Sequence, residues 1–291
     1  ADGSTYDTWT LDYTIEAPSA GQGHRFGHRL DANDNGDILA VSSLAPGQAG
    51  KVEIFIRTSQ SNDDSTQNSF ALAQTLTGVA GDGSTLNTSF GESIAMSKDG
   101  TTLFIGAPGL DGTETPDAGA VYVYKWNRDG STNTYPLDQT INEPDTLSGA
   151  KFGSSLSVNH EATRLIIGAE RAANPREMKF ESGQTTFDLQ DTTIVDTNAS
   201  SGAAYTATKY NTKYIVDDRL VSPNVSEHDD YGRGVCIIDN NVFVGAPKDE
   251  GNTGISNDGS VYCLDLTEEG VFAWKNITTE KAFVDIEKLG Q

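Results

Sequence analysis

Short apolar runs separated by turn residues recur along this chain, and their lengths predict β-strands rather than helices. In the most complete copy, Phe90-Gly91 opens the first run, residues 103–108 form the second and residues 119–124 form the third. In the third run β-branched and aromatic residues stand at alternate positions, which is typical of a strand. Turn residues such as Asn-Asp-Asn-Gly at 33–36 separate the first run from the second, and they predict a hairpin.

The same three runs occur four times with nearly constant spacing. The first position of the Gly-Ala-Pro segment lies 16 residues after the Phe in three copies and 14 residues after the Tyr in the last. A spacing that is kept in successive copies of the same runs indicates a repeat protein. The other copies comprise Phe26-Gly27 with 39–43 and 50–55, Phe152-Gly153 with 165–169 and 202–205, and Tyr231-Gly232 with 242–247 and 259–262.

A fourth apolar run precedes each Phe-Gly or Tyr-Gly by a short loop. Four antiparallel strands per unit, repeated with almost no helical pattern, are typical of β-propeller blades. Gly91 and Gly106 are expected to let neighbouring strands or blades approach closely, and Phe90 is expected to be an apolar plug between them. The fourth runs lie at 9–15, 70–76, 135–141 and 214–220, with a fifth such run at 271–277.

We therefore predict an all-β fold, with residues 1–291 forming one β-propeller domain or a segment of one. Two interpretations stay open, namely a small four-bladed ring with a spare strand, or part of a larger propeller whose other blades lie elsewhere. The third copy contains an insertion at 171–201, in which residues 178–189 are expected to form an added hairpin. The expected units cover about 9–56, 70–125, 135–208 and 214–265, followed by a strand at 271–277 and a tail at 278–291.

Phe-Gly followed by Gly-Ala-Pro and then Gly-x-Val-Tyr resembles the FG-GAP repeat of integrin α-subunit propellers and their relatives. The resemblance covers roughly residues 9–277, and the second copy has every element. It implies a propeller of four-stranded blades, although integrin propellers have seven blades and this chain shows four copies. The departures are Tyr231 for Phe in the fourth copy, Glu170 for Pro in the third, and Ser42-Ser43-Leu44 for Gly-Ala-Pro in the first.

The resemblance also raises the question of Ca²⁺, because integrin-like blades often carry an Asp-x-Asp/Asn-x-Asp/Asn-Gly-x-x-Asp loop between strands one and two. Its first defined positions are matched, but Leu39 stands where the closing carboxylate should be, and Asp37 is only nearby. We interpret the segment as a turn and keep Ca²⁺ as a candidate cofactor. The candidate metal ligands are Asp31, Asn33, Asn35 and Asp37.

Acidic residues also gather in the loops between strands two and three of two copies. Such clusters suit a cation, but in so acidic a chain we expect them to be solvated. These loops project from the same face as the links from strand four to the next unit, and there we expect a partner to dock. The acids are Asp111, Glu114 and Asp117 in the second copy, and Asp249, Glu250 and Asp258 in the fourth.

The charge balance of the 291 residues, 42 acids against 20 bases, gives a net charge of −22 and argues against nucleic-acid binding. No apolar run is long enough for membrane insertion. The charge suits an extracellular or surface-exposed setting, whether secreted, on a filament or on a virion. Four Asn-x-Ser/Thr sequons, no more than chance provides, give candidate glycosylation sites at Asn87, Asn198, Asn224 and Asn276.

Two cysteines do not make a disulfide scaffold in a chain of this length. Cys236 belongs to the first expected strand of the fourth copy and Cys263 to the third, with the second strand between them. Alternate strands lie about 9.6 Å apart, beyond the roughly 7 Å that a disulfide allows between Cα atoms. We predict two buried thiols that are not paired with each other.

We expect a non-enzymatic adhesion or assembly module that binds a protein or glycan partner at a loop face. Self-assembly, or contact with further blades of a larger chain, would also engage its surfaces. One alternative is a propeller component of a virus tail or cell-surface filament, and another is a surface carbohydrate-active enzyme, which would need a buried acid pair in a cleft. The histidines show no metal-ligand spacing, and no nucleophile elbow or phosphate loop occurs.

Overall fold

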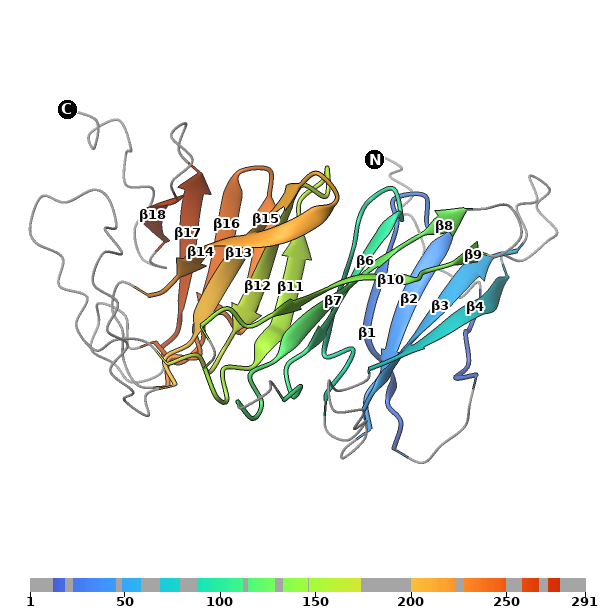
Figure 1. The fold of residues 1–291 in the computed structure, drawn as a ribbon, viewed down its shortest axis with the longest axis horizontal. Coiled ribbons are helices and arrows are strands. Elements are labelled where there is room, and N and C mark those ends of the chain that lie inside the picture. Colours follow the sequence, from blue (N-terminus) through green and yellow to red (C-terminus); the bar gives the residue numbers. More distant parts are fainter. Residues whose placement is uncertain are drawn as a thin grey trace, which may run out of the picture.

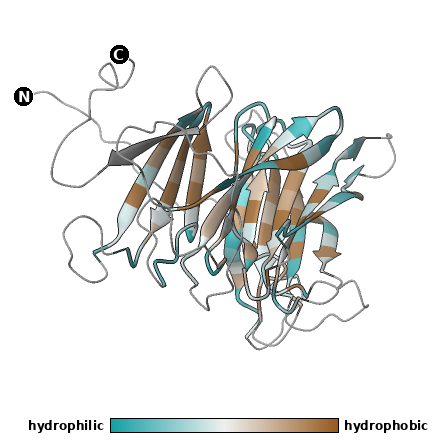
Figure 2. Cartoon of the chain, turned by 60° about the vertical axis from the view of Figure 1, so that its left-hand side comes forward, coloured by the Kyte–Doolittle hydropathy of each residue, from teal (hydrophilic) through white to brown (hydrophobic). Residues whose placement is uncertain are grey.

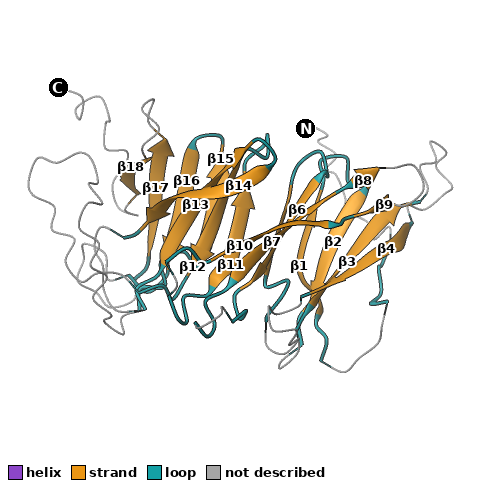
Figure 3. Cartoon of the chain, viewed as in Figure 1, coloured by secondary structure: helices purple, strands orange, loops and turns teal. Residues whose placement is uncertain are grey.

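The computed structural model contains strands and turns throughout the residues that it describes, and the predicted all-β class is confirmed (Figure 3). Those residues include no helix with the length and apolar character needed to cross a membrane. The hydrophobic residues form bands across the sheets (Figure 2). The described residues are 13–18, 23–45, 49–58, 69–78, 88–111, 115–128, 133–145, 147–173, 200–222, 228–249, 258–266 and 272–277.

Sixteen of the strands form four antiparallel sheets of four strands each, and we call these sheets blades 1 to 4. Blade 1 contains β1 (Phe26–Ala32), β2 (Ile38–Ser43), β3 (Lys51–Arg57) and β4 (Phe70–Thr77); blade 2 contains β5 (Ser93–Met96), β6 (Thr102–Ala107), β7 (Ala120–Lys125) and β10 (Leu137–Asn142). Blade 3 contains β11 (Phe152–Val158), β12 (Arg164–Ala169), β13 (Ala203–Tyr210) and β14 (Lys213–Leu220); blade 4 contains β15 (Gly234–Ile238), β16 (Asn241–Ala246), β17 (Ser260–Leu266) and β18 (Phe272–Ile277). A small ribbon of β8 (Asn127–Arg128) and β9 (Asn133–Thr134) connects β7 to β10.

The blades stand face to face in a row in chain order, with blade 1 at one end and blade 4 at the other (Figure 1). The first strands of successive blades contact one another along this row, β1 with β5, β5 with β11, and β11 with β15. Each of the three hydrophobic cores draws its side chains from two successive blades. The apolar residues of a strand therefore serve a core between blades rather than a core inside one blade.

The sheets are offset by one strand from the expected sequence units. β4, expected to open the unit at 70–125, pairs with β3 of the preceding blade, and β10 and β14 behave in the same way. A hairpin joins the third and fourth strands, whereas the next loop crosses to a new sheet. Within the expected strand at 9–15, residues 13–15 show no strand, and the rest of it lies outside the described residues, as does the expected hairpin at 178–189.

Each predicted turn between the first and second strands is present, and a buried polar side chain closes three of them. The Asn33 Oδ1 atom accepts hydrogen bonds from the backbone N–H groups of Asp37 (3.1 Å) and Ile38 (3.0 Å). Asn159 repeats this arrangement in blade 3, and the Ser97 Oγ atom accepts from the Thr102 N–H at 2.9 Å in blade 2. These bonds account for the burial of three polar residues at the ends of hairpins.

The close approach predicted at the glycines is confirmed at the junctions between blades. A Cβ atom added to Gly106 would lie 2.0 Å from the carbonyl oxygen of Gly153 in the next blade. Gly168 and Gly232 repeat this contact, also at 2.0 Å, at the following junction. Because these neighbours are backbone atoms, no side-chain movement can make room there.

An aromatic ring fills each of the three junctions, as expected for Phe90. Phe90 and Phe152 are fully buried, and each packs edge-on at 5.3 Å against a tyrosine of its own blade, Tyr122 and Tyr205 respectively. Tyr231 lies at the third junction, with the Tyr262 ring at the same 5.3 Å. The Phe or Tyr at each of these three junctions is thus a core residue.

A second tie joins the fourth strands of neighbouring blades. The Gln74 side chain of blade 1 accepts a hydrogen bond from the Tyr135 N–H at 2.6 Å and donates one to the Tyr135 carbonyl at 3.3 Å. Gln139 binds the backbone of Tyr214 in the same way, at 2.9 and 2.7 Å. We call each of these pairs a Gln–Tyr clamp.

The cysteines confirm the expected strand order but correct one expected environment. Cys236 and Cys263 are both partners of Phe243, on opposite sides of it in the sheet, and they form no disulfide. Cys263 is buried as predicted, whereas Cys236, which lies on the edge strand β15, is exposed.

We therefore predict that a thiol reagent will titrate one cysteine in the native protein and both after denaturation without reductant. Cys236 is accessible, and burial protects Cys263 from the reagent. A Cys236→Ser variant, as control, should show no fast-reacting thiol. Two fast thiols in the native protein, or none after denaturation, would contradict the assignment.

Candidate functional site

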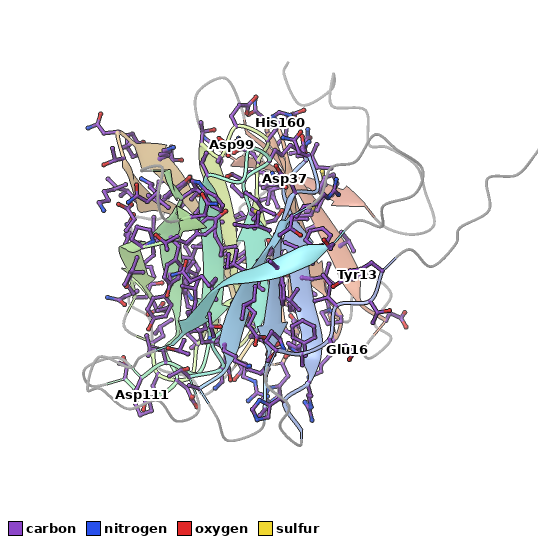
Figure 4. All side chains as sticks on the ribbon, turned by 90° about the vertical axis from the view of Figure 1, so that its right-hand side faces the viewer. Tyr13, Glu16, Asp37, Asp99, Asp111 and His160 are labelled. Atoms are coloured by element: carbon purple, nitrogen blue, oxygen red, sulfur yellow. The ribbon has the colours of Figure 1, made fainter. Side chains whose placement is uncertain are left out.

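The row of blades has two rims with different loops. The turns between first and second strands form one rim, where Asp37, Asp99 and His160 lie, and Asp111 lies at the opposite rim (Figure 4). Ala120, the first residue of β7, pairs with Ala107, the last residue of β6, and with Asn142, the last residue of β10. These three strand ends therefore lie together at the opposite rim. The loops between strands two and three therefore share one end with the links between blades, and we call that end the loop rim.

A cluster of polar side chains ties two elements of the loop rim together between blades 2 and 3. The Tyr205 hydroxyl of β13 lies 3.0 Å from Glu143 Oε1 and 2.8 Å from Asp145 Oδ2, both in the link that follows β10. Arg219 of β14 forms an ion pair with Asp145 at 3.0 Å and stacks over the Tyr205 ring. The Leu147 N–H donates to Glu143 Oε2 at 2.8 Å and closes the link on itself.

These contacts identify the cluster as a brace for the loop rim. Two carboxylates on one hydroxyl form the kind of acid pair that a carbohydrate-active enzyme would need. Here, however, both Glu143 oxygens are engaged by Tyr205 and Leu147, and Arg219 holds Asp145. These residues were not predicted from the sequence, in which the signal for them is a tyrosine at one position of three repeats, residues 122, 205 and 262.

The electrostatics of the brace follow from its burial. Burial raises the pKa of the Glu143 carboxyl above its ordinary 4.5, and the negative charge of Asp145 raises it further against the lowering effect of the Leu147 N–H. Burial also raises the pKa of the Tyr205 hydroxyl well above its usual range. Tyr205 therefore remains protonated and donates its hydrogen bond throughout the working pH range.

Replacing Glu143 with Gln should change the pH dependence of stability in a defined direction. The folded protein holds the Glu143 proton more tightly than the unfolded chain, so this group contributes most stability below pH 4.5 and loses it as pH rises through the raised folded pKa. The stability of Glu143→Gln relative to wild type should therefore rise with pH across that window. Urea unfolding at successive pH values measures it, with Glu161→Gln on the opposite rim as control, and a difference that falls as pH rises would contradict the prediction.

Blade 4 repeats the brace with other partners and corrects one expectation. The Tyr262 hydroxyl donates to Asp249 and accepts a hydrogen bond from the Ser222 hydroxyl at 3.1 Å. Asp249 is buried, although its place in an acidic loop predicted a solvated side chain. The hydrogen bond from the buried Tyr262 hydroxyl offsets the cost of removing this carboxylate from water. Burial raises the pKa of Tyr262 as well, with Asp249 adding to the effect.

The other acids of the loop rim behave as expected for a solvated surface, wherever they are described. Asp111 is exposed and accepts a hydrogen bond from the Asp117 N–H at 2.8 Å, while the Asp117 carboxylate pairs with Lys151 at 2.9 Å. Glu114 and Glu250 lie outside the described residues, and Asp258 is exposed. Further ion pairs on this rim join Glu170 to Arg233 and Asp230 to Lys248.

The four candidate calcium ligands are not brought together as a set. The Asp31 carboxylate turns toward blade 2, where its Oδ2 atom accepts from the Met96 N–H at 2.7 Å. The Asn33 oxygen is used inside the turn, and its Nδ2 atom donates to Asp37 Oδ1 at 2.5 Å. Asn35 lies in the same turn. Nowhere in the described part of the chain do three His, Cys, Asp or Glu side chains gather as metal ligands would.

Calcium removal is therefore expected to leave thermal stability nearly unchanged. An ion bound only by the folded state would raise the unfolding temperature, so its removal would lower it. Thermal unfolding with EDTA, with EDTA followed by excess Ca²⁺, and with neither provides the measurement. A large fall with EDTA that Ca²⁺ reverses would show a tight site.

One of the four glycosylation candidates, Asn276, lies within the part of the chain that the structure describes. Asn276 lies in β18 and pairs with Tyr262 of β17. Asn87, Asn198 and Asn224 lie outside the described residues. A sequon within a paired strand is a poorer acceptor than one in a surface loop.

A family model that describes the FG-GAP repeat matches residues 74–124, from within β4 to the end of β7. This segment is an FG-GAP repeat. The match begins in blade 1 and continues through the first three strands of blade 2, so the FG-GAP repeat is offset from the sheets in the same way as the expected units. No curated protein sequence matches the chain.

The solved structures that match the chain share little sequence with it. Tricorn protease matches with a TM-score of 0.40 and 12% identity, over 86% of this chain and 22% of its own length. The β-propeller domain of Cps50 (Swd1) from Myceliophteria thermophila matches with a TM-score of 0.39 and 11% identity, over 86% of this chain and 52% of its own. The chain thus spans less than two thirds of either relative.

Proposed function

We propose that this FG-GAP protein is a non-enzymatic module that binds a protein or glycan partner at its loop rim in an extracellular or surface-exposed setting. The braced rim is the observation that supports the proposal. Tyr205 and Arg219 hold the link after β10 through Glu143 and Asp145, so these loop segments are fixed before a partner arrives. A preformed surface binds at a lower cost in conformational entropy.

The charge of the rim indicates which partners fit. Asp111 is exposed, and Asp117 offers a carboxylate that is only partly engaged by Lys151. With a net charge of −22, the chain favours basic surfaces, since complementary charge speeds encounter and excludes wrong partners. We therefore expect a basic protein surface or a cationic glycan such as one rich in free amino groups.

A pair of charge-neutralised variants tests the rim. Asp111→Asn with Asp117→Asn alters the loop rim, and Asp34→Asn with Glu161→Gln alters the turn rim by the same two charges. The wild type and both variants are applied to arrays of immobilised extracellular protein domains and of glycans. Binding that is weakened in the loop-rim variant and kept in the turn-rim variant supports the proposal. Equal loss in both, unchanged binding in both, no binding by the wild type, or cleavage of a bound glycan would overturn it.

A further inference from the structure

The three junctions between blades share one construction, and its two halves are separable. The following blade contributes an aromatic residue and a glycine at the start of its first strand or just before it, which we call the knob. The preceding blade contributes a small residue in its second strand and a glycine just before its third, which we call the slot. The knobs are Phe90-Gly91, Phe152-Gly153 and Tyr231-Gly232, and the slots are Ser42 with Gly50, Gly106 with Gly119, and Gly168 with Gly202.

The fit of knob to slot is tight and repeats closely. A Cβ atom added to Gly50, Gly119 or Gly202 would lie 2.1 to 2.2 Å from the carbonyl oxygen of the aromatic residue seated on it. At two junctions a parallel backbone bridge joins the slot glycine to the knob, Gly119 to Phe152 and Gly202 to Tyr231. The slot therefore fits the backbone of a Phe-Gly or Tyr-Gly knob closely.

Blade 4 carries a slot on which no described residue of another blade is seated. Gly245 and Gly259 stand at the slot positions, and a Cβ added to either would meet only atoms of blade 4, at 3.6 and 3.0 Å. The face around them is open at Val261, although Cys263, two residues further along the same face of β17, is buried. Val261 is 48% exposed, whereas the equivalent Val121 and Ala204 are fully buried beneath the next blade.

Blade 1 carries the matching knob, and it too has no slot beneath it within the described part of the chain. Gly27 has a φ of +86°, close to the +88° to +91° of the three seated knob glycines, and a Cβ added to it would meet nothing within 4 Å. Phe26 is only half-buried, against Phe55, while the other three knob rings are fully buried. Leu30, next to this knob, is 64% exposed.

The unused knob and the unused slot lie at opposite ends of the row (Figure 1). We propose that blade 1 of one copy docks on blade 4 of a second copy, with Phe26-Gly27 seated on Gly245 and Gly259. This contact is head-to-tail, so it joins different surfaces of the two copies and builds either a ring or an open filament. It uses the blade faces and does not depend on a partner at the loop rim.

Two blocked variants test the docking by complementation. Gly245→Val fills the slot, and it is sterically tolerated in the isolated chain because the nearest atom lies 3.6 Å away. Phe26→Ser removes the knob ring. Val261→Asp and Leu30→Asp are second variants for slot and knob, each at an exposed position, and Ala73→Val on exposed β4 is the matched control. Circular dichroism establishes that each variant is folded.

Sedimentation velocity over a wide concentration range gives the result. Wild type and Ala73→Val should form species heavier than the 31.0 kDa chain, and each blocked variant alone should sediment as a single chain. An equimolar mixture of a slot variant and a knob variant should form a complex of two chains and no larger. The two chains together have one intact knob and one intact slot, and their contact uses both. A wild type that stays at one chain mass at every concentration, as a four-bladed closed ring would, overturns the proposal. So does a mixture that stays at one chain mass.

Discussion

Gly106→Ala is expected to prevent stable folding or to lower the free energy of unfolding by roughly 3 kcal/mol or more, the upper range for overpacking. The added methyl group would lie 2.0 Å from the Gly153 carbonyl oxygen of the next blade, and the Ser93 Oγ atom is 2.2 Å away. Relief therefore needs separation of blades 2 and 3 and loss of the Phe152 core contact. Urea unfolding, or the soluble yield where the variant does not fold, measures the effect.

Gly234→Ala is the matched control, since nothing lies within 4 Å of the added atom and Gly234 does not adopt a positive φ. It should be neutral or slightly stabilising, because alanine restricts the unfolded chain more than glycine does. Equal urea midpoints for Gly106→Ala and Gly234→Ala would show that the blades do not approach at Gly106.

Phe90→Ala is expected to lower the free energy of unfolding by about 3 to 5 kcal/mol, the usual range for removing a buried Phe. The Phe90 ring is fully buried at the junction of blades 1 and 2, with Tyr122 and Tyr124 edge-on to it at 5.3 and 6.4 Å. Its loss leaves a cavity, because Gly78 and Gly50, which border the ring and its backbone, have no side chains to fill it. The urea midpoint of the variant gives the loss of stability.

Asp111→Ala provides the comparison at the loop rim. Asp111 is exposed and holds only the Asp117 N–H, so its removal should change stability by about 0.5 kcal/mol or less. A midpoint shift for Asp111→Ala as large as that for Phe90→Ala would show that the two side chains contribute equally to stability, and it would refute the assignment of Phe90 to the core.

The sequence predicted the features that repeat. The recurrent copies, with 16 residues from the Phe to the first position of the Gly-Ala-Pro segment in three of them, located the strands, the turns after β1 and β5, and the glycines at 91 and 106, because each of these is set by local backbone chemistry and is then copied. Phe90 was predicted as core for the same reason, since its apolar ring recurs beside a glycine in every unit.

Features that depend on which blade covers which face were not predicted. The burial of Asp249 needs Tyr262 to reach it, and Cys236 is exposed on β15, the strand at one edge of the blade 4 sheet. The Tyr205 brace joins residues about 60 positions apart, Glu143 and Asp145 with β13, and no period links them. Tyr205 and Tyr262 stand at the same repeat position, but their carboxylate partners come from different loops, so the repeat does not predict them.

The Gln–Tyr clamps have a consequence for cooperativity. They fasten blade 1 to blade 2 and blade 2 to blade 3, but Asp218 occupies the position in β14 that Gln74 and Gln139 occupy in β4 and β10. A carboxylate has no N–H to offer a carbonyl, so this position cannot form the donating half of the clamp. In a linear array, stability is the sum of unit terms and of couplings between neighbours, and unequal couplings decide where melting starts. Opening should begin with blade 4 and spread inward, with the amide hydrogens of β16 exchanging before those of β6.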